Sequence, residues 1–276
     1  METITSFLTG NFIWLFLLGA VAFWLMGRAR SQKQREQTQR ENERAREQAT
    51  GLGIKVSEQA EGLSRTGGST TGPQVGGDTR YEGTTGDIPW AMAVEVRMSD
   101  RGTGTRANEV WKQTTRWKTT SVSWPAGKFL MIMSTPGEMK VGDVKEGGLF
   151  NKMINWAANQ FLDLYVGGYF GSEYKPLVNV EGATILRKEV MKDFYMITNE
   201  PALAEKFLDE ATQTTMANWK KLPQGFKQEG RVDQFGLLFA PDGMVLACQA
   251  ALTDPNEAKM FSDFGAALAI KARAFR

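Results

Sequence analysis

The chain contains no histidine among its 276 residues. Ser-His-Asp and Cys-His catalysis both need an imidazole that accepts and returns a proton near neutral pH, so both are excluded. Zinc, copper, non-haem iron and haem sites that depend on imidazole ligands are excluded for the same reason. The chemistry that remains is that of carboxylate pairs, lysine bases, Ser-Lys dyads and oxygen-ligated Mg²⁺ or Ca²⁺.

The sequence contains one cysteine, Cys248, in the apolar run MVLACQA. A disulfide within one chain and a cysteine-ligated zinc site both need more than one cysteine and are excluded. We expect Cys248 to be a small buried hydrophobic residue, the alternative being a catalytic thiol. A nucleotide-binding loop is disfavoured as well. No GK[ST] motif occurs, and the Gly-rich stretch within residues 51–87 is not predicted to lie between a strand and a helix. No motif therefore identifies a catalytic residue, a metal ligand or a cofactor site.

Charge is absent from the N-terminal segment, since no charged residue lies between Glu2 and Arg28. A helix rising about 1.5 Å per residue would cover a hydrocarbon layer of ~30 Å over this length. The alternative is an export signal with a cleavage site at Ala20-Val21-Ala22. However, a signal has basic residues before its apolar core, which are missing here, and the apolar run continues to Met26. We therefore predict a retained single-pass transmembrane helix over residues 1–27.

The residues that follow are polar, and seven Lys or Arg residues lie between Arg28 and Arg46. Basic residues beside a span resist translocation, so we expect a bacterial inner-membrane protein with its N-terminus outside and its folded domain in the cytoplasm. Residues 28–50 are predicted to form a charged helical stalk, because they offer no apolar face to bury. Residues 51–87 are rich in Gly, Ser and Thr, which indicates a flexible linker.

A folded domain is predicted over residues 88–276, where apolar residues recur with the periods of strands and helices. Alternation from Trp90 to Met98 indicates a strand, and Pro-Asp-Gly between two apolar runs indicates a hairpin over 231–250. Further strands are expected at 110–124, 128–134, 183–190 and 194–198, and helices at 148–166, at 201–222 with a break near 211–215, and after Asp254. Five to seven strands with about three helices, in no regular βαβ order, predict an α+β domain with one mixed or antiparallel sheet.

The predicted strand at 110–124 carries the first candidate partner-binding residues. Its alternation places Trp111 and Trp117 on one face, and Lys112, Arg116 and Lys118 on the other. Basic residues beside aromatic ones can bind the phosphates of nucleic acid or lipid. The acidic and basic residues of the domain are nearly balanced in number, so nucleic acid is disfavoured, and the alternative is a solvated strand face.

The Gly-punctuated loop GGYFGSEY carries the second group of candidates, Tyr169, Phe170 and Tyr174. Exposed aromatic side chains are common anchors at protein interfaces. Buried aromatic side chains that belong to the core are the alternative. We therefore predict that Trp111, Arg116, Trp117, Lys118, Tyr169, Phe170 and Tyr174 are the positions at which a partner would bind.

The layout of anchor, stalk, linker and compact domain is similar to that of bacterial membrane tethers for division or secretion machinery. It favours a membrane-tethered, non-catalytic domain that binds or scaffolds another protein, so the expected partners are the membrane and a protein. The alternative is a membrane-anchored hydrolase that uses carboxylates or a Ser-Lys pair. Ser134 and Lys140, in MSTPGEMK, are the nearest such pair, although closeness in sequence does not supply the geometry that a Ser-Lys dyad needs.

Overall fold

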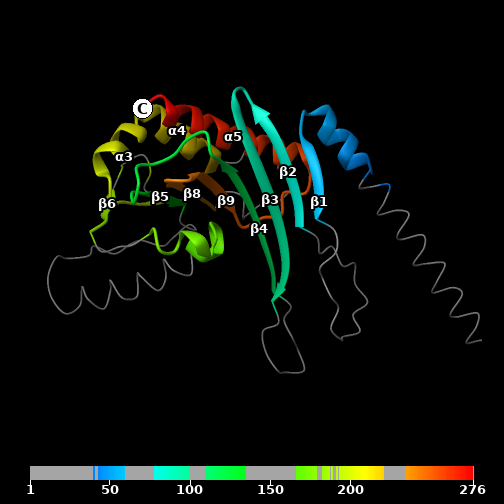
Figure 1. Cartoon of the computed structure of the whole chain (residues 1–276), viewed down its shortest axis with the longest axis horizontal. Helices are drawn as coiled ribbons and strands as arrows, with labels where there is room; N and C mark the ends of the chain where they lie inside the picture. The colour runs from blue at the N-terminus through cyan, green and yellow to red at the C-terminus, as the bar shows by residue number, and fades with distance from the viewer. Residues whose placement is uncertain are drawn as a thin grey trace, which may run out of the picture. The chain divides into compact units, whose positions relative to one another are not determined.

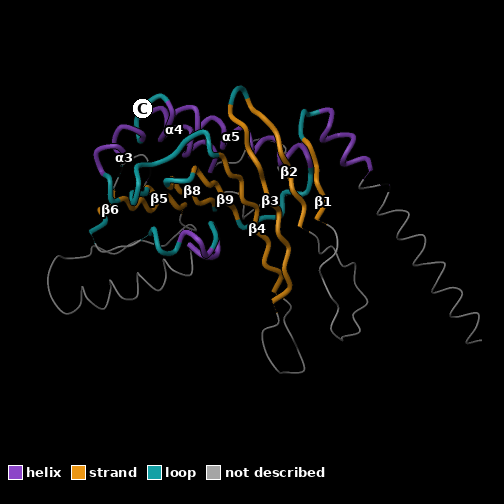
Figure 2. The backbone as a smooth tube through the Cα atoms, in the orientation of Figure 1, coloured by secondary structure: helices purple, strands orange, loops and turns teal. Residues whose placement is uncertain are grey.

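The computed structural model describes residues 40, 43–59, 78–99, 110–134, 166–178, 182–186, 188, 191, 193–220 and 234–275 (Figures 1 and 2). The predicted transmembrane helix over 1–27 lies outside the described residues, as do Lys140 and nearly all of the helix predicted over 148–166. Within the described ranges, no helix has both the length and the apolar character that a membrane span requires. The chain divides into two compact units, Met1–Gln48 and Ala49–Arg276, and the second contains the whole sheet.

One nine-stranded sheet in the order β1-β2-β3-β4-β9-β8-β5-β7-β6 organises this second unit, and every neighbouring pair is antiparallel. The structure therefore confirms an α+β domain and resolves the mixed-or-antiparallel alternative in favour of an antiparallel sheet. The strands are β1 (Lys55–Gln59), β2 (Asp78–Thr85), β3 (Ile88–Ser99), β4 (Val110–Thr119), β5 (Leu130–Ser134), β6 (Thr184–Leu186), β7 (Phe194–Thr198), β8 (Phe235–Ala240) and β9 (Gly243–Cys248).

Helices α3 (Pro201–Phe207) and α4 (Glu210–Lys220) lie between β7 and β8 in sequence, and α5 (Pro255–Arg273) follows β9. The predicted break in the helix at 201–222 occurs earlier than expected, because Leu208 leaves the helical region and α4 restarts at Glu210. The Asp254 side chain accepts a hydrogen bond from the backbone N–H of Asn256 at 2.9 Å, and Pro255 occupies the first turn. Both features are strong signals for a helix start, which is why α5 begins where the sequence indicates.

The helices cover one face of the sheet and enclose the larger hydrophobic core. Trp117 of β4 and Leu246 of β9 are neighbours on this face, and both are fully buried. The ring of Trp219 on α4 stacks on Phe264 of α5 with centroids 4.4 Å apart. Gly265 of α5 faces Trp117 so closely that an added Cβ would lie 2.8 Å from the indole ring. The contact between α5 and the sheet therefore depends on the absence of a side chain at this position.

The folded domain begins before residue 88, which corrects the predicted linker over 51–87. Strands β1 and β2 lie inside that segment and pair with each other and with β3, while residues 60–77 lie outside the described part. The composition gives little sign of these strands. In β2, for example, Tyr81 is the one large apolar residue. Its ring is buried, and its hydroxyl donates a 2.8 Å hydrogen bond to the carbonyl oxygen of Thr253. Backbone pairing and this one anchor hold a strand whose other residues are polar or small.

The opposite face of the sheet carries a second, smaller core over β5, β8 and β9. A segment that we call the strap, residues 166–178, packs on this side; it contains a helical turn and the short 3₁₀ helix η1 (Ser172–Tyr174). In Figure 1 the strap is the short green helical piece on the far side of the sheet from α5. The side chains of Tyr169, Phe170 and Tyr174 are buried there against residues such as Met131 and Leu238.

Candidate functional site

Strand β4 brings the predicted basic face and the predicted aromatic loop together. Alternation along the strand directs Trp117 towards α5 and directs Arg116 and Lys118 towards the strap, as the sequence predicts for these three side chains. Trp111 lies opposite Met98 in the register of β3 and β4, and its side chain is outside the described part. Two groups of candidates that are about fifty residues apart in sequence thus form one site.

Arg116 is the central residue of this site and fastens the strap to β4. Its Nε donates to the carbonyl oxygen of Tyr169 at 2.7 Å, and one terminal nitrogen donates to the carbonyl oxygen of Gly168 at 3.3 Å. The other terminal nitrogen forms an ion pair with Glu95 of β3 at 2.6 Å. Both side chains of the pair are about four-fifths buried, with exposed fractions of 20% and 23%. A planar guanidinium can serve three acceptors at once, which a lysine ammonium cannot do with the same geometry.

Lys118 makes the second connection between β4 and the strap. Its ammonium donates to the hydroxyl of Tyr174 at 2.7 Å and pairs with Asp242, in the turn between β8 and β9, at 2.7 Å. The Tyr174 hydroxyl in turn donates to the same Asp242 oxygen at 3.1 Å. The ammonium also lies 5.3 Å from the centroid of the Tyr174 ring, within range of a cation–π interaction.

The pKa values of this triad reflect the network. Burial alone would lower the pKa of Lys118, but its hydrogen bonds to Asp242 and Tyr174 outweigh burial and raise it. Burial alone would likewise raise the pKa of Asp242, but the hydrogen bonds from Lys118 and Tyr174 lower it. Burial raises the pKa of Tyr174. The hydrogen bond and charge of Lys118 act to lower this pKa, and those of Asp242 act to raise it. The triad therefore favours a charged pair with a neutral phenol between its members, which is a structural arrangement rather than a poised acid or base.

The aromatic candidates lie inside the domain and not on its surface. Trp117, Tyr169, Phe170 and Tyr174 are each at most 4% exposed. Gly236 of β8 provides room for two of these rings, since an added Cβ would lie 2.7 Å from the ring of Phe170 and 3.2 Å from that of Tyr169. In this conformation these side chains are part of the core, as in the alternative considered for the aromatic loop. Their role in partner binding stays a prediction.

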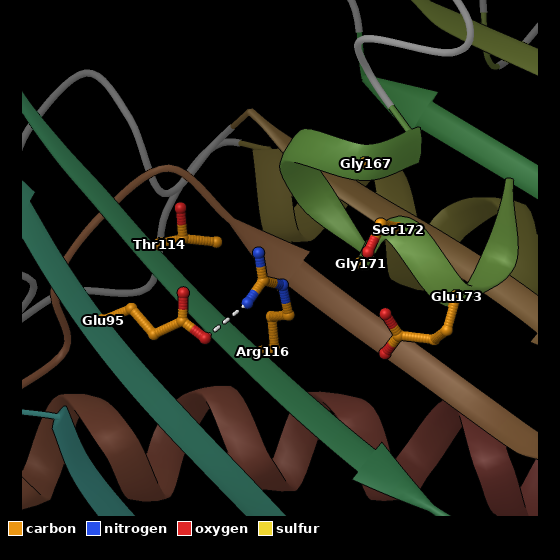
Figure 3. A pocket seen from close by; sticks show the side chains of 7 residues that line it. All are labelled: Glu95, Thr114, Arg116, Gly167, Gly171, Ser172 and Glu173. Carbon is orange, nitrogen blue, oxygen red and sulfur yellow. Dashed lines mark hydrogen bonds and ion pairs between the residues drawn. The ribbon is translucent and has the colours of Figure 1, made fainter. Parts of the chain in front are cut away.

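A polar cavity of about 270 Å³ lies between the strap and strands β3 and β4. Its lining comprises Glu95, Thr114, Arg116, Gly167, Gly171, Ser172 and Glu173. Figure 3 shows the Arg116 guanidinium between the carboxylates of Glu95 and Glu173. Of the seven lining residues, only Arg116 was a candidate from sequence. Glu95 could have been noticed in the sequence, because it is a charged residue between two valines in the alternating strand at 90–98. The strap residues gave no sign of a cavity, because their neighbours on β4 are remote in sequence.

Ser134 and Cys248, the two nucleophiles considered from the sequence, are buried. The hydroxyl of Ser134, which is 3% exposed, accepts a hydrogen bond from the backbone N–H of Phe235 at 2.8 Å. Cys248 is fully buried, and burial raises the pKa of its thiol to about 12. A nucleophile needs access to substrate and an activated oxygen or sulfur, and neither side chain has both. Among the described residues, no group of three or more acidic or cysteine side chains is arranged to hold a metal ion.

Comparison of the chain with models of protein families, with curated proteins and with solved structures gave no match.

Proposed function

We propose that the chain is a membrane-tethered, non-catalytic domain that binds another protein. Residues 1–27 would anchor it in a bacterial inner membrane with the N-terminus outside, and the basic residues from Arg28 onward would keep the domain on the cytoplasmic side. Residues 28–50 would serve as the stalk. Burial of Ser134 weakens the Ser-Lys form of the hydrolase alternative, because this side chain cannot reach a substrate in this conformation.

One observation carries the binding proposal: strands β1, β2 and β3 have an exposed face on the side of the strap. The register aligns Ser57, Arg80 and Ala93 with Arg116, and Lys55, Glu82 and Ala91 with Lys118. We call the six residues Lys55, Ser57, Arg80, Glu82, Ala91 and Ala93 the open face. Four of them, Lys55, Arg80, Glu82 and Ala91, are exposed.

The chemistry of the open face suits a protein partner better than nucleic acid. Its small central side chains let another chain approach the backbone of the sheet. Charges of both signs surround them, since Lys55 and Arg80 are balanced in part by Glu82. Mixed charges give a partner directional contacts, whereas a nucleic acid needs an excess of positive charge.

Site-specific cross-linking tests the binding proposal. A photoreactive residue at Ala91, on the open face, is expected to join the full chain to a defined partner in cells. The matched control is the same substitution at Ala267, which is exposed on α5 on the other side of the sheet. Adducts of the same identity and amount from both positions would contradict binding through the open face, and so would the absence of adducts from Ala91.

The tether is tested separately. Cell fractionation should find the full chain in the membrane and a variant without residues 1–27 outside it. A tag at the C-terminus should stay protected from protease added to the periplasmic side of intact cells. If the tag were digested there, the proposed orientation and the cytoplasmic location of the domain would both be wrong.

A further inference from the structure

The cavity between the strap and β4 has the size and lining of a site for a small polar group. Its volume of about 270 Å³ could hold roughly nine waters at ~30 Å³ each, or a side chain of moderate length. Three of its walls come from parts of the chain that are remote in sequence: Glu95 from β3, Thr114 and Arg116 from β4, and residues 167–173 from the strap. Arg116 therefore has two roles here, since it lines the cavity and its hydrogen bonds to the carbonyl oxygens of Gly168 and Tyr169 hold the strap against β4.

The charge within the cavity is unbalanced towards the negative. Arg116 already pairs with Glu95 at 2.6 Å and serves two backbone carbonyl oxygens, so most of its donor capacity is engaged. The second carboxylate, that of Glu173, has no ion pair in the described part of the chain. Lys175 is the nearest further cation on the strap, but it does not line the cavity. The lining residues alone, Glu95, Glu173 and Arg116, therefore carry a formal charge of −1.

Two hydroxyl groups add hydrogen-bonding capacity. Thr114 is 2% exposed and lines the cavity. Its place in the cavity lining makes a bound group the natural acceptor or donor for its hydroxyl. Ser172, which is exposed on the strap, supplies the second hydroxyl.

A glycine leaves room for the carboxylate of Glu173 beside the cavity. Gly171 has a φ of 123°, and an added Cβ would overlap the carboxylate, which folds back over this position. Only glycine adopts such a φ readily, so this position favours glycine for its backbone conformation as well as for the room it leaves.

From these features we propose that the cavity binds an organic cation, a primary ammonium or guanidinium group, between Glu173 and the hydroxyls of Thr114 and Ser172. Glu173 supplies the countercharge, and the hydroxyls accept N–H hydrogen bonds. The group can belong to a small free molecule or to a Lys or Arg side chain of a partner. The site does not rest on the proposed function, because it needs neither membrane attachment nor a partner for its measurement.

The test uses matched probes on the isotope-labelled full chain. Butylguanidinium and its neutral counterpart butylurea have nearly the same shape and differ in charge. Butylguanidinium is expected to shift the NMR signals of the Gly167 and Gly171 amides in a saturable manner, and butylurea is not. Equal shifts from both probes, or a stronger response to butylphosphonate, would overturn the proposal, the latter by assigning the site to anions through Arg116.

Variants localise the effect. E173Q is expected to weaken butylguanidinium binding about tenfold, the size of one lost charge-assisted hydrogen bond. The matched control is E82Q, which removes a carboxylate from the same side of the sheet outside the cavity lining and should leave binding unchanged. Glu173 is exposed, so the substitution spares the core. Unchanged binding in E173Q, or equal weakening in E82Q, would overturn the proposal.

A second pair of probes distinguishes the two sources of the cation. The capped peptide Gly-Arg-Gly is compared with the same peptide carrying citrulline, which is neutral, in place of Arg. Tighter binding of the Arg peptide than of butylguanidinium supports a cation carried by a partner protein. Tighter binding of butylguanidinium supports a free ligand. If the citrulline peptide binds as well as the Arg peptide, charge is not recognised and the cation site is wrong.

Discussion

The Nε of Arg116 lies 2.7 Å from the carbonyl oxygen of Tyr169, a residue 53 positions further along the chain. This contact joins the basic strand to the aromatic strap and encloses the cavity beside them. A side chain that looks from sequence like a contact for an external phosphate instead satisfies internal carbonyl groups. The charged face of β4 is therefore used within the domain near Arg116 and Lys118, and the exposed polar surface lies beyond it, on β1 to β3.

We predict that Arg116→Gln lowers the free energy of unfolding by about 1–3 kcal/mol, because the carboxylate of Glu95 loses its ion pair with Arg116 in a largely buried setting. Urea unfolding followed by tryptophan fluorescence measures the change. Arg80→Gln is the control, since Arg80 is exposed on the same cross-strand row, and a change within about 0.5 kcal/mol is expected there. Equal losses in the two variants would show that Arg116 does not fasten the strap.

The pair of Lys118 and Asp242 should add stability that depends on pH in a defined direction. The folded-state pKa of Asp242 is below its ordinary value of about 4, so its contribution is present above that pH and disappears as the pH falls through the folded-state pKa. The effect should be under about 1 kcal/mol, because both side chains are close to half exposed. Midpoints of urea unfolding for the wild type and Asp242→Asn should differ near neutral pH and converge in acid. A difference of the same size at neutral and at acid pH would contradict this origin.

Where the sequence predicted elements well, the signal was local. Strand β7 occupies 194–198 as predicted, and the Pro-Asp-Gly turn joins β8 to β9. Both cases rest on residues that are neighbours in the chain, where periodicity and turn chemistry act. The start of α5 follows from Asp254 and Pro255 for the same reason.

Where prediction failed or stopped, the deciding contacts were remote in sequence. The polar composition of β2 indicates a linker. The strand is instead stabilised by its pairing with β3 and by the hydrogen bond from Tyr81 to the carbonyl oxygen of Thr253, and neither contact is visible in the local sequence. The sequence shows that the strap is aromatic. It does not show that the strap covers the second core or that Arg116 bonds to it, because both contacts join segments that are remote in sequence. The cavity beside Thr114 likewise lies between segments remote in sequence, so no pattern in the sequence could have indicated it.

The contact between Gly265 and Trp117 gives a further prediction. Alanine is normally better in a helix than glycine by about 1 kcal/mol. At position 265, however, its Cβ would lie 2.8 Å from the ring of a fully buried tryptophan, so we expect Gly265→Ala to destabilise the domain by about 1–3 kcal/mol. Thermal or urea unfolding measures the loss.

A double-mutant cycle tests the physical reason for that loss. Trp117→Phe leaves room at the ring, and within the described ranges the buried indole N–H has no hydrogen-bond partner to lose. Gly265→Ala should therefore cost less in the Trp117→Phe background than in the wild type, with a coupling of about 1 kcal/mol. Strict additivity of the two changes would indicate that the glycine is needed for another reason.

The single cysteine provides a probe of whole-domain opening. Cys248 is fully buried on β9, and burial raises the pKa of its thiol to about 12, so both access and thiolate are lacking in the folded state. At about pH 8 we expect a disulfide reagent such as DTNB to modify the folded protein only through the small population of unfolded domain, and to modify it at once in concentrated guanidinium chloride. Rates for the destabilised Gly265→Ala variant should rise in step with its loss of stability, while Arg80→Gln should label like the wild type. Rapid labelling of the folded wild type would show that β9 opens locally, and it would restore the catalytic-thiol alternative that its burial now disfavours.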